Sequence, residues 1–126
     1  MAQRDVVLRW IQQAARVIAR LLRGGKPGDL ELARIELESA EEALLGPLAR
    51  LIPALETRSA SALLGDPERI LGYGRLLLLR SALRRALGEE EAAAQDESRG
   101  REFQDLALAA RPDLATLWGD DSDDAS

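Results

Sequence analysis

The sequence predicts an all-α protein, and three observations support this class. Leu, Ala, Arg and Glu, which are good helix formers, dominate the chain, whereas β-branched residues are few. No segment alternates apolar and polar residues with the period of two that indicates a half-buried strand. Apolar residues recur instead at three- and four-residue steps between Gly and Pro breaks. We therefore expect a bundle of five to six helices, stacked as antiparallel hairpins, in a single domain over residues 1–118.

The first predicted helix covers residues 3–23 and is followed by a Gly- and Pro-rich turn at 24–28. One face of this helix is apolar, with Val7, Trp10, Ile11, Ala14, Val17, Ile18 and Leu21. A second helix is predicted over residues 30–45, with Asp29 as its N-cap, and the short turn makes the pair an antiparallel hairpin. Leu30, Ala33, Leu37, Ala40 and Leu44 form one apolar stripe of the second helix, and Leu32, Ile35 and Ala43 form another. Two stripes predict a helix that lies between two neighbours.

The second half of the chain predicts further helices. Pro53 interrupts the helical spacing of residues 48–64, so two short helices are expected there, over one end of the bundle. Asp66-Pro67-Glu68 is a strong helix start, and the helix that follows should end at Leu87 before Gly88. Gly72 and Gly74 within it indicate a bend or the close approach of a neighbouring helix. A last helix is expected over residues 89–110, followed by a disordered acidic tail at 119–126.

Several segments resemble, in the same order, a family of small bacterial helical proteins of unknown function. These segments are Asp5–Ile11, Gly28–Ala33, Ala43–Gly46, Asp66–Glu68 and Leu87–Ala92. The resemblance covers most of residues 1–110 and implies distant kinship with tetratricopeptide repeats, which are stacked helical hairpins that bind other proteins. The match to the repeat consensus itself is poor, and no 34-residue period recurs along the chain. The resemblance implies helical hairpins and no active site.

The composition excludes many kinds of site. With no His and no Cys, the chain lacks His-dependent nucleophile activation, thiol chemistry and zinc-finger ligand sets. Aromatic residues make up 3% of the chain and the net charge is −5, so nucleic-acid binding is not expected. No apolar run approaches the roughly 20 residues that a membrane helix needs, and no signal peptide is recognisable. We expect a cytoplasmic protein that is not an enzyme and uses no metal or cofactor.

Arginine is concentrated on one side of the first helix. At 100° per residue, Arg9, Arg16, Arg20 and Arg23 lie nearly opposite the apolar face, and we call them the arginine stripe. Glu31, Glu38 and Glu42 form an acidic stripe on the second helix, at steps of seven and four residues. The arginine stripe is either a solvated outer face or the contact for an acidic partner, and a membrane surface is the least favoured alternative. The acidic stripe can pair with it across the hairpin or in a second copy of the chain.

A second candidate surface lies on the helix that follows Asp66. Arg69, Arg80 and Arg84 surround Tyr73, a composition typical of interface hot spots, although ordinary surface with an amphipathic Tyr is the favoured alternative. From both surfaces we expect a protein-interaction or adaptor module that self-associates, with a dimer as the simplest form. The alternative is a bundle that binds a small ligand or lipid, which a cavity between the second and fourth helices would favour.

Overall fold

The computed structural model describes residues 9, 11–13, 15–16, 18–20, 22–24 and 26–116. Its elements are α2 (Pro27–Leu45), the 3-10 turns η1 (Gly46–Leu48) and η2 (Ile52–Ala54), α3 (Thr57–Leu64), α4 (Pro67–Ala86) and α5 (Glu90–Ala110). The described residues between 9 and 22 are helical too, and we call this segment helix one. No strand occurs in the described ranges, so the all-α class is confirmed. The predicted start at Gln3, the contacts of Leu117 and Trp118, and the acidic tail lie outside them.

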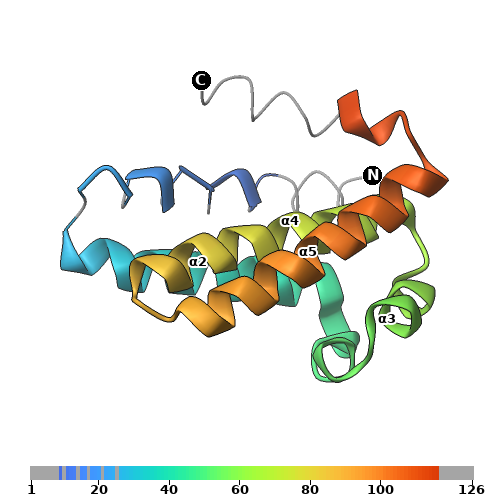
Figure 1. The fold of residues 1–126 in the computed structure, drawn as a ribbon, viewed down its shortest axis with the longest axis horizontal. Helices are drawn as coiled ribbons and strands as arrows, with labels where there is room; N and C mark the ends of the chain where they lie inside the picture. The colour runs from blue at the N-terminus through green and yellow to red at the C-terminus, as the bar shows by residue number, and fades with distance from the viewer. Residues whose placement is uncertain are drawn as a thin grey trace.

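The helices form two hairpins that lie against each other (Figure 1). Helix one and α2 join at one end of the long axis and run back side by side, and α4 and α5 form the longer hairpin. Among the elements from α2 to α5, contact between α4 and α5 is the most extensive, and α2 packs on α4. The predicted short helices of residues 48–64 are η1, η2 and α3, and α3 contacts α4 and α5 near one end. The core therefore lies around α4, where nine residues are buried.

Helix boundaries follow the capping residues, with one shift. Asp66 caps α4 as predicted, because its Oδ1 accepts a hydrogen bond from the backbone N–H of Glu68 at 3.0 Å. The predicted N-cap role of Asp29 is wrong. The helix α2 begins at Pro27, and Asp29 lies in its first turn, where its carboxylate accepts from the backbone N–H of Lys26 at 3.0 Å. Proline fits the first helical position, so α2 starts before Asp29 and not after it.

The second apolar stripe of α2 is not buried as predicted. Ala33, Leu37, Ala40 and Leu44 face the core, but Leu32 is 40% exposed and Ile35 is 50% exposed. Ala43, the third member of this stripe, is partly buried and packs against the core, so the stripe is exposed at Leu32 and Ile35. Its outer surface presents Ile35 among the carboxylates of Glu31, Glu38 and Glu42, which are all exposed.

Glycine sets the distance between α4 and α5. A Cβ atom built on Gly74 would lie 2.8 Å from the carbonyl oxygen of Gly100, and a Cβ on Gly100 would lie 2.8 Å from that of Gly74. Both helices are thus in backbone contact at this point, as the two glycines in the first half of α4 indicated. Gly72 has more room, since its nearest neighbours, the side chains of Leu44 and Ile11, would be in ordinary contact with a Cβ.

Candidate interaction surfaces

Two arginines of α4 are held by a buried carboxylate of α5. Asp96 is only 6% exposed. Arg80 donates to it from two nitrogens, Nε to Oδ2 at 2.9 Å and Nη2 to Oδ1 at 3.0 Å, and Arg84 donates from Nη1 to Oδ2 at 2.9 Å. Burial opposes the charge on Arg80, but the hydrogen bonds and charge of Asp96 raise the pKa of its guanidinium above the ordinary value. Both arginines therefore join α4 to α5.

The remaining members of the predicted surface on α4 also make contacts inside the chain. Arg69 donates from Nε to the carbonyl oxygen of Leu44 at 2.9 Å and from Nη2 to that of Leu45 at 3.0 Å. It thus binds carbonyls at the C-terminus of α2, which have no partner within their own helix. Tyr73 is 1% exposed and meets the ring of Phe103 edge-on, with ring centroids 5.1 Å apart.

The predicted exposed cluster around Tyr73 is therefore wrong as a surface. Three of its members are arginines whose donors bind Asp96 or the end of α2, and the fourth is a core aromatic residue. Burial raises the pKa of the Tyr73 hydroxyl above its ordinary value. We assign these four residues to the packing of α4 against α2 and α5.

Asp96 was missed in the sequence, although a signal was present. The buried residues of α5 are Ala93, Asp96, Gly100, Phe103 and Ala107, at steps of three and four residues. The alanines at the two ends of the helix do not share this face, since Ala92 is only partly buried and Ala110 is exposed. A carboxylate at a regular core position of a helix indicates a buried ion pair, because an unpaired buried charge is too costly.

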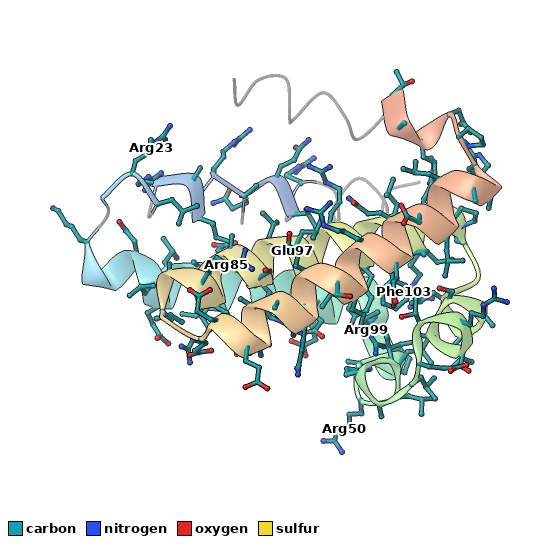
Figure 2. All side chains as sticks on the ribbon, in the orientation of Figure 1. Arg23, Arg50, Arg85, Glu97, Arg99 and Phe103 are labelled. Carbon is teal, nitrogen blue, oxygen red and sulfur yellow. The ribbon has the colours of Figure 1, made fainter. Side chains whose placement is uncertain are left out.

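The arginine stripe, in contrast, is exposed along helix one. Ile11 and Ile18 point into the core, each 2% exposed, whereas Arg9, Arg16, Arg20 and Arg23 are all exposed. Figure 2 shows Arg23 directed away from the body of the molecule. Among the residues that the structure describes, none forms an ion pair or side-chain hydrogen bond with the stripe. The predicted pairing with the acidic stripe across the hairpin does not form there.

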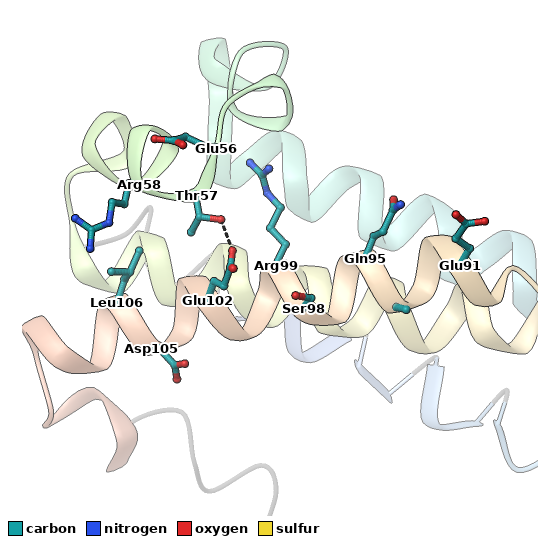
Figure 3. A pocket seen from close by; sticks show the side chains of 11 residues that line it. Glu56, Thr57, Arg58, Glu91, Gln95, Ser98, Arg99, Glu102, Asp105 and Leu106 are labelled. Carbon is teal, nitrogen blue, oxygen red and sulfur yellow. Dashed lines mark hydrogen bonds between the residues drawn. The ribbon is translucent and has the colours of Figure 1, made fainter.

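Hollows also lie elsewhere on the described surface, and two of them bear on ligand binding. An open groove of about 890 Å³ separates α3 from α5 (Figure 3). Its polar groups hold this part of the fold together: Thr57 donates to Glu102 at 2.6 Å, and Arg99 donates to the carbonyl oxygen of Ile52 at 2.9 Å. The Arg99 guanidinium also lies 5.3 Å from the centre of the Phe103 ring. The groove is therefore mainly a packing junction.

The second hollow is a more enclosed cavity of about 260 Å³ between α2 and α4. Leucine side chains, among them Leu37, Leu76 and Leu83, line it together with charged side chains of both signs, including Glu41 and Arg80. Burial raises the pKa of the Glu41 carboxyl, and Arg80, whose Nη1 lies 3.9 Å from Glu41 Oε1, lowers it by a smaller amount. The carboxylate of Glu41 is thus partly desolvated and is not bound by a close donor.

No family model, no curated protein and no solved structure matches this chain. In the described ranges, no helix is long and apolar enough to cross a bilayer, and no group of three or more His, Cys, Asp or Glu side chains is arranged to hold a metal ion. Function therefore has to be argued from the surfaces themselves.

Proposed function

We propose that this chain is a non-catalytic protein-interaction module whose arginine stripe binds an acidic protein surface. The observation that carries the proposal is the contrast between two sets of arginines. Arg69, Arg80 and Arg84 of α4 are bound to the end of α2 or to Asp96. Arg9, Arg16, Arg20 and Arg23, in contrast, are exposed along helix one. A row of guanidinium groups suits carboxylates, which it can bind through two parallel hydrogen bonds.

The core side of helix one supports a protein partner over a membrane. A helix that lies on a lipid surface inserts its apolar face, but Ile11 and Ile18 are buried in the bundle. Among the described residues of helix one, the exposed side carries the arginines, and Leu22 is its exposed large apolar side chain. The family that the sequence resembles is distantly akin to tetratricopeptide repeats, which bind proteins, and a cytoplasmic bacterial adaptor would fit this role.

The test is capture of partners from native cell extract by the tagged chain, with identification by mass spectrometry. Arg16→Glu with Arg20→Glu should abolish capture of the specific partners, because both side chains lie at the centre of the stripe. The matched control is Arg50→Glu with Arg58→Glu, which makes the same change in net charge. Both arginines are exposed and follow α2 in the chain; Figure 2 shows Arg50 at the opposite side of the molecule. Unchanged capture by the stripe variant, or equal loss in the control, contradicts the proposal.

The cavity between α2 and α4 favours a second function, binding of a small ligand. Leu37, Leu76 and Leu83 offer apolar contact, and the Glu41 carboxylate offers an acceptor without a close donor. The chemistry suits a short alkyl chain with an ammonium head. Titration with n-butylammonium, followed by NMR of the leucine methyl groups, should shift Leu76 and Leu83, whereas Glu41→Gln should weaken binding. Equal binding of n-butanol to both forms would show that the carboxylate is not part of the site.

A further inference from the structure

The arginine stripe and the acidic stripe have the same spacing. Arg9, Arg16 and Arg20 follow one another at steps of seven and four residues. Glu31, Glu38 and Glu42 do the same on α2. At a rise of about 1.5 Å per residue, each stripe places its charges about 10.5 Å and then about 6 Å apart along the helix axis. Two helices with these stripes match charge for charge only in a parallel arrangement.

This arrangement cannot occur within one chain. Helix one and α2 are antiparallel partners of the same hairpin (Figure 1). In an antiparallel alignment the seven-residue step of one stripe meets the four-residue step of the other, so no shift aligns all three charges. Both stripes are exposed, and no ion pair joins them among the residues described. Their common spacing is thus available only between molecules.

Helix one and α2 border one surface of the molecule, and the arginine stripe reaches it at Arg9. A shallow hollow of about 320 Å³ is lined by Arg9 and Gln13 of helix one and by Glu36 and Ser39 of α2. Ser39 lies one helical turn from Ile35, which is 50% exposed among the glutamates of the acidic stripe. An arginine that reaches a neighbouring glutamate can lay its methylene stem on this apolar side chain.

We propose that the acidic surface bound by the arginine stripe is the acidic stripe of a second copy of this chain. This proposal rests on the interaction function proposed above. Because helix one and α2 run in opposite directions, a two-fold axis perpendicular to them places helix one of each copy parallel to α2 of the other. The pairs are Arg9 with Glu31, Arg16 with Glu38 and Arg20 with Glu42, formed twice. Such an interface uses the same patch on both copies and closes at a dimer.

Sedimentation velocity of the pure full-length chain and of two charge-reversed variants tests this arrangement. The first variant carries Arg16→Glu and Arg20→Glu, and the second carries Glu38→Arg and Glu42→Arg. At about 100 μM and low salt, the unchanged chain should be dimeric and each variant alone monomeric. An equimolar mixture of the two variants should restore the dimer, because each reversed helix then faces a reversed partner. The dimer of the unchanged chain should dissociate in about 0.5 M NaCl, where charges are screened over a few ångströms.

Restoration in the mixture also shows that both variants are folded, since unfolded chains would not complement each other. The self-docking is refuted if the unchanged chain is monomeric, if either variant alone remains dimeric, or if the mixture stays monomeric while both variants retain the helical circular dichroism of the unchanged chain. The general interaction function is judged separately by the capture experiment. A monomeric chain whose capture of a foreign acidic protein still requires Arg16 and Arg20 would overturn the dimer and leave that function in place.

Discussion

Gly100 lies in the middle of α5, where a side chain would meet the backbone of α4. Alanine ordinarily stabilises a helix interior by about 1 kcal/mol relative to glycine. At this position, however, the new Cβ would lie 2.8 Å from the carbonyl oxygen of Gly74 and 3.1 Å from Cγ of Leu78. The backbone atom cannot rotate away, so the two helices must separate, and overpacking of this kind costs about 1–3 kcal/mol. We expect Gly100→Ala to lower the free energy of unfolding by up to about 2 kcal/mol after the gain in helix propensity is subtracted.

Urea unfolding followed by circular dichroism at 222 nm measures this change. Gly28→Ala is the matched control, because Gly28 lies in the first turn of α2 and a Cβ atom placed on it would have nothing within 4 Å. It should leave stability unchanged or raise it by up to about 1 kcal/mol. Gly74→Ala combined with Gly100→Ala should cost less than the sum of the two single changes, since one separation of the helices accommodates both methyl groups. If Gly100→Ala stabilises the protein as a solvent-exposed Gly→Ala change does, the close backbone contact does not exist.

Three further predictions concern charged groups of the core. Asp96→Ala leaves Arg80 and Arg84 without their buried acceptor and should lower the free energy of unfolding by about 3 kcal/mol. This value is at the low end for a broken buried pair because both guanidinium groups are partly exposed. A loss below the error of urea titration would contradict the pairing. Arg69→Ala removes the donor to the last carbonyls of α2 and should cost about 1–2 kcal/mol, with faster hydrogen exchange confined to the end of α2 as its signature. Burial raises the pKa of the Glu41 carboxyl, so the folded state holds that proton more tightly than the unfolded state, and this contribution to stability is lost as the pH rises through the raised value. Glu41→Gln should therefore stabilise the protein at pH 7, by less than about 1 kcal/mol because the Glu41 side chain is partly solvated. The difference in stability should vanish below the ordinary pKa of glutamate. Equal stability of the two forms at every pH would contradict the desolvation of Glu41.

Much of the secondary structure was predictable because its causes are local. The cap of α4 needs only Asp66 and the backbone of the residues next to it, and the end of α4 needs only Gly88, whose φ of 83° few other residues adopt. The exposure of the arginine stripe was also predictable, because charged side chains opposite a strongly apolar face point into solvent. Even the start of α2 was determined locally, and the error there came from choosing Asp29 over Pro27 as the signal.

Local patterns therefore predict which segments are helical and that helix one presents its arginines to solvent. Which of the other amphipathic faces has a partner depends on how the helices pack. The periodicity of α2 shows that Leu32 and Ile35 share a face, but not that this face lacks a neighbour; that of α4 shows Arg80 and Arg84 together, but not that Asp96 lies opposite them. A helical wheel gives each side chain its direction about its own axis, whereas burial and charge pairing depend on the second helix that this direction meets.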